Sequence, residues 1–279
     1  MSGRRIDDTT SPRTVLCIGA HPDDCEFSCS GIATKFADNG ARVIIVSVTD
    51  GRSGHHELST DEVAAKRRNE AQNAAAIIGA ESRVIGAPDG ALEPSLEYRH
   101  AIIKLAREVK PDLIITNRPN DYHPDHRYTA LLIQDSAYMF MVPHVVPEVP
   151  PLEYNPIILY WGDFFTYPRE IRPDVVVAID DVHDTKMDML DAHESQVYEW
   201  LPWIDRYPEP VPAEPAERRK WLKRFCGRGP SFADLFRREL IERYGEKIGS
   251  GTRHAEVFEI CEYGSQPTPA KFETLFRGV

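Results

Sequence analysis

Residues 15–24, VLCIGAHPDD, join a short apolar run to a dense group of polar residues. The apolar run at 15–19 has the length and composition of a buried parallel strand, and the AHPDD after it is typical of a loop. Proteins whose strands and helices alternate bind their ligands in a crevice at the carboxyl ends of the parallel strands. The polar residues of this loop are therefore candidate functional residues.

The segments that follow repeat the strand and helix pattern. Gly40 and Gly79 stop two predicted helices, and Ser59 with Glu62 has the spacing of a capping box at the start of the second. The sequence predicts helices at about 28–39, 59–78 and 95–109, and strands at 43–48, 83–85 and 113–116. This alternation predicts an α/β fold, with a Rossmann-like and largely parallel sheet flanked by helices.

The second half of the chain continues the pattern less regularly. A helix is predicted from 128 to about 140, and the Pro-rich connector at 142–151 is expected to be an extended surface loop. Further strands are predicted at 157–161, 175–179 and 256–261, and further helices at 185–198 and 232–244. We expect a flexible N-terminus at 1–12, one catalytic core at 13–200, and a C-terminal helical and strand extension at 201–279 packed on the same domain.

Composition and charge exclude several classes of protein. With 279 residues, 42% of them hydrophobic, the chain can bury a sizeable core. The formal net charge of −11 offers no positive field to the phosphates of a nucleic acid, so we expect no nucleic-acid partner. The first 13 residues are polar, and no later run reaches the ~18 apolar residues of a membrane span. We therefore expect a cytoplasmic protein with no membrane partner.

Several common chemistries lack their sequence motifs. The five cysteines are odd in number and form no CxxC pair, which favours free thiols. Neither GxGxxG nor GxxxxGK[ST] follows a strand, which argues against a nucleotide-binding Rossmann protein. No GxSxG elbow indicates a serine hydrolase. The chemistry must therefore come from other residues.

Two polar segments contain closely spaced histidines and carboxylates. The first is HPDD at 21–24, after the strand at 15–19, and the second is HPDH at 123–126, after the strand at 113–116. If the two strands are neighbours in a parallel sheet, both segments open on the same carboxyl edge. Neutral imidazole and carboxylate are zinc ligands, and three protein ligands leave a fourth position for a reactive water. The two segments together therefore predict a catalytic metal site.

Each segment taken singly is also explained as a turn, because Pro and Asp are common loop residues and His is tolerated there. Their joint presence at two strand ends, in a chain with ten histidines, favours the metal site. The adjacent His55 and His56 are a weaker candidate, because consecutive residues rarely offer both side chains to one ion. We expect these two to be exposed to solvent.

AHPDD at 20–24, about a hundred residues before HPDH, resembles the PIG-L/LmbE family of N-acetylglucosaminyl deacetylases and related amidases. The resemblance extends through TDGRSG at 49–54, the Arg67-x-x-Glu70 helix and HESQ at 193–196, and covers most of residues 15–200. AHPDDC also resembles the form found in diacetylchitobiose deacetylases. The resemblance implies a zinc-dependent enzyme that removes an N-acetyl group from an N-acetylglucosamine-type sugar or sugar conjugate.

The family pattern also implies a role for each matching residue. It makes His21, Asp24 and His126 the zinc ligands, and Asp23 the general base beside the metal-bound water. It makes His123 the donor to the tetrahedral oxyanion, and leaves either His123 or Asp23 to protonate the departing amine. Iron(II) can replace zinc in the cell, because ligand type alone does not fix the metal.

Four further residues are candidates for substrate binding, each with a structural alternative. Arg67 matches a family arginine that holds substrate hydroxyls, but it fits a solvated helix face as well. Asp89 matches an acidic position that contacts sugar in relatives, but Asp before Gly is also ordinary turn chemistry. Arg52 lies in a loop that opens toward the same crevice, and His193 lies near a helix end, where it can cap the last carbonyls.

Two other functions remain open on the sequence alone. One is an amidase on a thiol-cofactor precursor or an antibiotic conjugate, which would use the same catalytic residues. The other is a non-catalytic, metal-containing carbohydrate-binding protein, which would have no use for a base such as Asp23. We expect a small-molecule partner, and the family resemblance implies a homo-oligomer, either a trimer or a hexamer.

Overall fold

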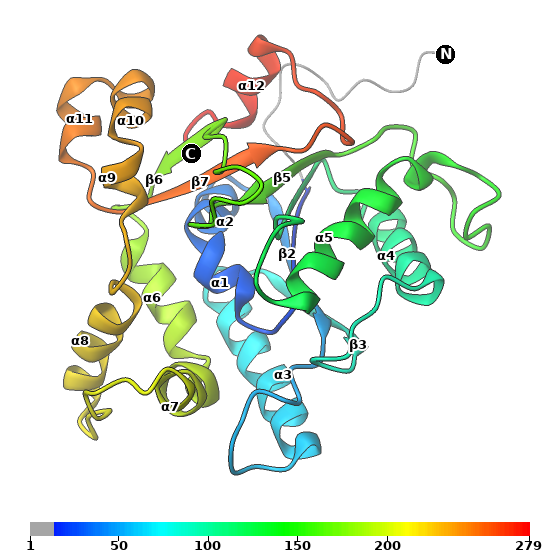
Figure 1. The fold of residues 1–279 in the computed structure, drawn as a ribbon. Coiled ribbons are helices and arrows are strands. Elements are labelled where there is room, and N and C mark those ends of the chain that lie inside the picture. Colours follow the sequence, from blue (N-terminus) through cyan, green and yellow to red (C-terminus); the bar gives the residue numbers. More distant parts are fainter. Residues whose placement is uncertain (1–13) are drawn as a thin grey trace.

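The computed structural model describes residues 14–279, so the flexible N-terminus predicted at 1–12 lies outside the described residues. Within 14–279, seven strands form one sheet in the order β3-β2-β1-β4-β5-β7-β6 (Figure 1). Each overlaps a strand predicted from the sequence. The strands are β1 (Thr14–Gly19), β2 (Arg42–Thr49), β3 (Glu81–Ala87), β4 (Leu113–Thr116), β5 (Ile157–Trp161), β6 (Val175–Ala178) and β7 (Ala255–Ile260).

The sheet is largely parallel, as the sequence predicts. Strands β1 to β5 pair in parallel, whereas β7 is antiparallel to both β5 and β6. β4 and β5 are buried along their whole length, which is why they appear in the sequence as unbroken apolar runs. Burial on both faces requires a layer of helices on each side of the sheet.

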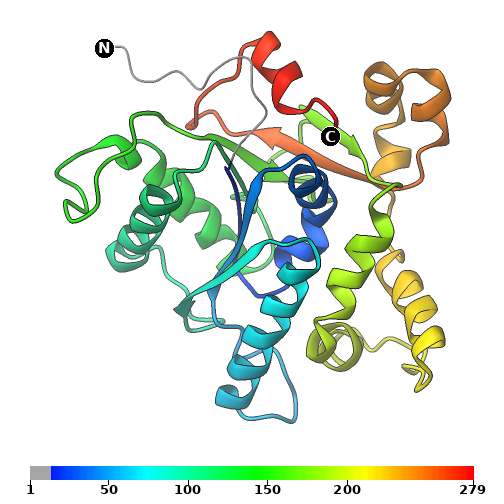
Figure 2. The same cartoon turned by 180° about the vertical axis from the view of Figure 1, so that it is seen from behind.

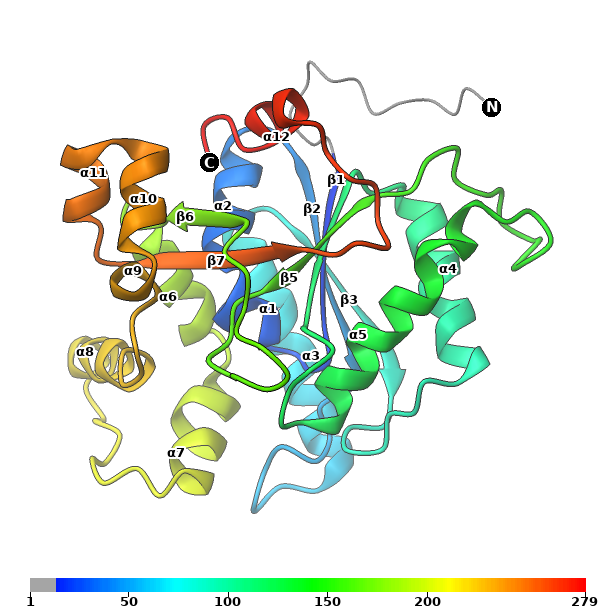
Figure 3. The same cartoon turned by 45° about the horizontal axis from the view of Figure 1, so that its top comes forward.

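Helices cover both faces of the sheet (Figures 2 and 3). A hydrophobic core lies between each layer of helices and the sheet. Successive side chains of β1 point to opposite faces, so Val15 and Cys17 enter one core while Leu16 and Ile18 enter the other. On the first face lie α1 (Asp24–Ser28), α2 (Ser30–Asp38), α3 (Thr60–Ile77) and α6 (His183–Asp191); on the second lie α4 (Leu96–Val109) and α5 (Pro124–Ala137).

The start of α3 agrees with the sequence prediction, whereas the end of α6 does not. The capping box of Ser59 and Glu62 is present at the start of α3. The helix predicted at 185–198 is wrong in its second half, because α6 ends at Asp191 and a π-helical segment, Ser195–Trp200, follows it. In a continuous α-helix the amide of Ser195 would donate to Asp191, but here it donates to the Glu70 carboxylate at 2.8 Å.

The C-terminal part of the chain contributes to the central sheet. β7 lies between β5 and β6, so the predicted extension at 201–279 supplies an interior strand of the single domain. We propose on this basis that 201–279 does not fold separately from the core. The remaining helices are α7 (Leu201–Ile204), α8 (Pro215–Cys226), α9 (Phe232–Leu235), α10 (Arg237–Tyr244), α11 (Glu246–Gly251) and α12 (Pro269–Leu275). No helix within residues 14–279 has the length and apolar character to cross a membrane.

Candidate active site

The loops after β1 and β4 meet at one point of the sheet edge. β1 and β4 are parallel neighbours, with Val15 opposite Leu113 and Ile18 opposite Thr116. The strand order reverses at this pair, since β2 and β3 lie on one side of it and β5 on the other. Such a switch point is where open α/β sheets bind ligands. The prediction that the two polar loops follow neighbouring strands is confirmed.

Helices begin directly at these loops and fix their side chains. Asp24 is the first residue of α1, and its Oδ2 accepts hydrogen bonds from the amides of Ala20 (2.8 Å) and His21 (3.0 Å). A side chain at Gly19 would come within 2.6 Å of the Asp24 Cβ, so the strand must end in glycine for the loop to close. His123 is the N-cap of α5, which brings His126 into the first turn of that helix.

Three ligand-type atoms face one another between the two loops. His126 Nε2 lies 3.2 Å from His21 Nδ1 and 3.3 Å from Asp24 Oδ1, and His21 Nδ1 lies 3.6 Å from the same Asp24 oxygen. A tetrahedral zinc site with metal–ligand distances of about 2.0–2.2 Å holds its ligand atoms roughly 3.3–3.6 Å apart. The spacing of these three atoms therefore fits a single zinc ion.

Carboxylates behind each imidazole orient the ring nitrogens toward this point. His21 Nε2 lies 3.1 Å from Asp89 and 3.3 Å from Asp125, which leaves Nδ1 free to face Asp24. His126 Nδ1 lies 3.0 Å from Asp121, which turns Nε2 inward. Burial lowers the pKa of His126, but the nearby carboxylates outweigh burial and raise it to about 10. Carboxylate partners of this kind orient metal-ligating histidines.

Two other sets of residues around His21 also have ligand-type atoms that all lie within 4.8 Å of one another. The first set is His21, His123 and His126, and the second is His21, Asp89 and Asp125. In the latter group the side chains of Asp125 and Asp89 are only 1% and 7% exposed, and Asp125 Oδ2 already accepts a hydrogen bond from the Gly90 amide. A metal that acts on a substrate needs an open coordination position. The side chains of His21, Asp24 and His126 are 10%, 12% and 15% exposed, so this triplet is the better candidate for a catalytic metal.

Asp23 is a buried carboxylate next to the triplet. Burial raises its pKa to about 6, even though the guanidinium of Arg67 opposes that rise. Arg67 Nη2 donates to Asp23 Oδ1 at 3.1 Å. The backbone of Asp23 has a φ of 143°, a conformation that residues with a side chain rarely adopt. Asp23 is therefore held in a defined but strained position.

Arg67 is buried beneath the site, so the solvated helix face considered for it from the sequence is wrong. Its side chain is 3% exposed, and its guanidinium donates to the carbonyls of Gly51 (3.0 Å) and Pro22 (2.9 Å) as well as to Asp23. Gly51 has a φ of 70°, and a Cβ there would lie 2.6 Å from Arg67 Nη1. The TDGRSG loop therefore packs its backbone directly on this arginine.

His123 lies at the edge of the same cluster. Its ring centroid is 4.6 Å from that of His21 and 5.0 Å from that of His126. His123 Nδ1 accepts a hydrogen bond from the amide of Asp125 at 3.2 Å, which assigns the proton of the neutral ring to Nε2. Burial, together with the two neighbouring histidines, lowers the pKa of His123. The ring is thus a neutral donor through Nε2.

The remaining candidates occupy different positions. Arg52 is half-exposed and pairs with the neighbouring Asp50 at 2.5 Å. Asp89 Oδ2 accepts a hydrogen bond from the Ser53 amide, and Asp89 Oδ1 faces His21. His193 is fully buried 3.4 Å from Glu26, and its ring makes no hydrogen bond that would cap a helix end. The structure thus brings Asp89 to the cluster but sets Arg52 and His193 in other surroundings.

Sequence reasoning missed two residues of this region. Asp121 orients His126, and Tyr122, whose side chain is 74% exposed, stands edge-on to the rings of His123 and His126 at 5.8 and 5.9 Å. Both lie in the loop NRPNDYHPDH. Their only sequence signal is adjacency to the histidine pair, which does not tell an orienting carboxylate from a turn residue.

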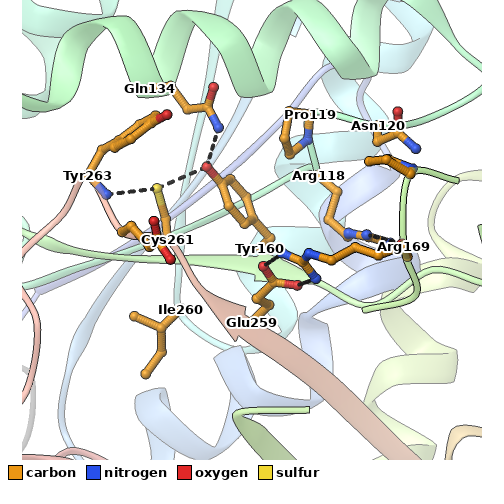
Figure 4. A pocket seen from close by; sticks show the side chains of 12 residues that line it. Arg118, Pro119, Asn120, Gln134, Tyr160, Arg169, Glu259, Ile260, Cys261 and Tyr263 are labelled. Atoms are coloured by element: carbon orange, nitrogen blue, oxygen red, sulfur yellow. Dashed lines mark hydrogen bonds and ion pairs between the residues drawn. The ribbon is translucent and has the colours of Figure 1, made fainter. Parts of the chain in front are cut away.

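A cavity of about 350 Å³ is lined by residues other than those of the histidine cluster (Figure 4). It lies against β5, β7 and the residues that directly follow β4. Its polar groups are paired with one another: Tyr160 accepts a hydrogen bond from Gln134 and contacts Cys261, and Arg169 pairs with Glu259. None of the clustered histidines lines it. We therefore assign the chemistry to the histidine cluster and not to this cavity.

Known proteins share both the motifs and the fold. A family model described as PIG-L, GlcNAc-PI de-N-acetylase, matches residues 16–137. The Bacillus cereus protein named "Probable N-acetyl-alpha-D-glucosaminyl L-malate deacetylase 2" is 30% identical over 196 residues, which cover 66% of this chain and 84% of that protein. The solved structure of N,N'-diacetylchitobiose deacetylase from Pyrococcus horikoshii is 28% identical, with a TM-score of 0.66 over 90% of this chain and 85% of that one.

A more distant structure has a different reaction in its name. The 4-carboxy-2-hydroxymuconate hydratase of Pseudomonas putida has 17% identity and a TM-score of 0.67, over 92% of this chain and 99% of that one. At that identity the likeness concerns the fold alone. The first two relatives are named deacetylases, which are amide hydrolases, and the matched residues 16–137 contain both polar loops. The chain belongs to the PIG-L family.

Proposed function

We propose that this chain is a zinc-dependent N-deacetylase that removes the acetyl group from an N-acetylglucosamine-type sugar or sugar conjugate. The observation that carries the proposal is the mutual spacing of 3.2–3.6 Å among His21 Nδ1, Asp24 Oδ1 and His126 Nε2. Two named deacetylases at 28–30% identity support the same reaction and the same class of sugar.

His21, Asp24 and His126 would hold the metal ion. When bound, zinc lowers the pKa of a coordinated water to about 7 and polarises the carbonyl of the acetamide. Asp89, Asp125 and Asp121 lie behind the two imidazoles and orient the opposite ring nitrogens toward the ion, which would displace any proton held there. Iron(II) would suit the same donors, and metal analysis of the purified protein decides between the two.

Asp23 acts as the general base. Its pKa of about 6 lies close to neutral pH, the range in which a carboxylate can both accept and return a proton. Arg67 keeps the carboxylate in place, so that the second oxygen is free to take the proton of the attacking water. His123 has a lowered pKa and is neutral, so Asp23 is the better donor of that proton to the departing amine.

His123 stabilises the oxyanion. The proton on Nε2 is fixed by the hydrogen bond that Nδ1 accepts, so the ring can donate to the acetamide oxygen as negative charge develops there. Removing one such donor raises the barrier by about 2.7–4 kcal/mol. The products are acetate and the free amine, and the proton from water ends on the amine.

The test is acetate release from a panel of substrates, with metal content measured in parallel. The panel holds N-acetylglucosamine, N,N'-diacetylchitobiose, N-acetylglucosaminyl malate and N-acetylglucosaminyl inositol, and N-acetylglycine serves as a non-sugar control. We expect one bound zinc or iron per chain and turnover of at least one sugar. The His126→Ala variant should bind zinc at least about 100-fold more weakly, whereas His144→Ala, at an exposed position, should bind it normally.

Other outcomes favour other functions. Turnover of the malate or inositol conjugate but not of the free sugars would indicate the amidase on a thiol-cofactor precursor. Metal and sugar binding without acetate release would indicate a binding protein, and hydration of a carboxymuconate would indicate the reaction of the more distant structure. The cytoplasmic location and the trimer or hexamer also belong to the proposal, and light scattering of the purified protein tests the assembly.

A further inference from the structure

The HESQ motif at 193–196 lies behind the candidate base and has no role in the chemistry described above. His193 is 0% exposed, and the π-helical segment begins two residues after it. Single π-helical turns inside helical segments are frequently found at functional sites. Because the imidazole has no access to solvent, any effect it has on the reaction must pass through its neighbours.

His193 and Glu26 are partners in the interior. His193 Nε2 lies 3.4 Å from Glu26 Oε1, and Glu26 is itself only 1% exposed. Within the described residues neither this oxygen nor either ring nitrogen meets hydrogen-bond geometry, so the contact between the two side chains is a charge pair. Burial lowers the pKa of His193, but Glu26 outweighs it and raises that pKa above its ordinary value. Each side chain is therefore the other's electrostatic partner in the interior.

Glu26 belongs to the short helix that carries the site. α1 starts at Asp24, directly after the strained Asp23, and Glu26 points from its first turn toward the region after α6. α6 also holds the other end of α1, because Lys186 Nζ donates to the Phe27 carbonyl at 2.7 Å. A strained backbone persists only when its surroundings fix it. The contacts of α1 with α6 and with His193 hold this helix, and thereby the strained backbone of Asp23, in place.

Ser195 and Gln196 of the motif contact residues that lie next to Arg67, the hydrogen-bond partner of Asp23. The Ser195 amide and hydroxyl donate to Glu70 at 2.8 and 2.6 Å, and Glu70 lies one turn after Arg67 on α3. Gln196 donates to the carbonyl of Gly54, in the loop that packs on Arg67. One short motif thus contacts both the helix that begins directly after Asp23 and the helix that carries its arginine partner.

We propose that His193, paired with Glu26, is a positioning residue that holds the first turn of α1, and with it Asp23 and Asp24, in the orientation needed for metal binding and proton transfer. The inference rests on the proposed function for its kinetic readout only, because metal affinity can be measured without turnover. Outer partners of a metal site typically contribute 10–100-fold to affinity or activity.

The test compares variants that keep or lose the contact. The double variant Glu26→Met/His193→Leu removes both charges together, which leaves no buried ion unpaired, so we expect it to fold. His193→Gln can return an amide N–H to Glu26, whereas the shorter His193→Asn cannot reach it. We expect zinc affinity, by chelator competition, and kcat to fall at least about 10-fold in the double and Asn variants, with KM within about threefold of the parent. The Gln variant should recover most of both.

His254→Leu is the matched control, since it removes a histidine–carboxylate pair, with Asp180 at 2.6 Å, outside the site. Its zinc affinity and kcat should equal those of the parent. Parent-like zinc affinity in the double variant, or equal losses in the Gln and Asn variants, would overturn the inference. If the double variant does not fold, the Gln and Asn pair decides alone. A parent protein that releases no acetate would contradict the proposed function but leave the zinc measurements as a valid test.

Discussion

Arg67 and Arg107 are both buried arginines on helices, yet they serve regions of different kinds. Arg107 is 1% exposed and donates six hydrogen bonds, all to backbone carbonyls of the Pro-rich segment between Met139 and Val149. Arg67 is 3% exposed and donates to two carbonyls and to the carboxylate of Asp23. Both organise a long loop, but only Arg67 also orients an ionisable group.

The difference shows that buried charge alone does not indicate a reactive site. Around Arg107 every donor meets an acceptor, so the region is satisfied without any further component. Around His21 the opposite holds, because two imidazole nitrogens and a carboxylate oxygen face one another at 3.2–3.6 Å. Donor atoms that converge in this way are stabilised by a cation, which would displace the proton that the carboxylates favour on His126. A variant near Arg67 should therefore affect chemistry, and a variant at Arg107 should affect stability.

The largest expected effect is that of Asp23→Ala. Loss of a general base should lower kcat by about 10²–10⁴-fold, while the three metal ligands remain. We expect zinc content to stay at the parent level, measured by elemental analysis beside acetate release. Asp181→Ala, at an exposed carboxylate, is the control and should keep full activity. Equal turnover in Asp23→Ala and the parent would remove Asp23 from the mechanism and make Arg67 as purely structural as Arg107.

Arg107→Met tests whether Arg107 contributes to stability and not to the chemistry. The methionine keeps an apolar stem but leaves six carbonyls without their donor, so we expect the free energy of unfolding to fall by about 3 kcal/mol. Zinc affinity and kcat of the folded fraction should stay within about twofold of the parent. Denaturant titration and chelator competition measure the two quantities. A large loss of zinc affinity at unchanged stability would show that the Pro-rich loop communicates with the site.

Local sequence signals were sufficient for most of the fold. The apolar runs located the strands, and the capping box of Ser59 and Glu62 located the start of α3, because these features depend on residues close together in the chain. The insertion of β7 between β5 and β6 could not be predicted, because strand order depends on contacts between distant segments. The end of α6 was missed for the same reason, since Glu70 takes the amide of Ser195 from a different helix.

The site was predictable where it follows from strand ends and not where it depends on side chains meeting across the core. His21 and His126 could be expected to converge because each follows a strand. The contact between Glu26 and His193 joins the first turn of α1 to the residues between α6 and the π-helical segment, and it has no local signal. His55 was expected to be exposed, which is wrong, because its side chain is buried against Glu199 at 2.9 Å.

Asp89→Asn should have the smallest effect of the three variants. It tests whether the region around Arg67 is linked to the histidine cluster. Asp89 lies 3.1 Å from His21 Nε2 and 3.9 Å from Arg67, so it couples the arginine region to the proposed metal-binding triplet. The amide can still accept a hydrogen bond but carries no charge, so His21 loses part of the partner that fixes its tautomer. We expect zinc affinity or kcat to fall about 10–100-fold, with no change in the free energy of unfolding beyond about 1 kcal/mol. If KM rises instead while zinc affinity stays constant, Asp89 binds substrate rather than orienting His21, because a ligand-orienting carboxylate acts on the metal before any sugar is present.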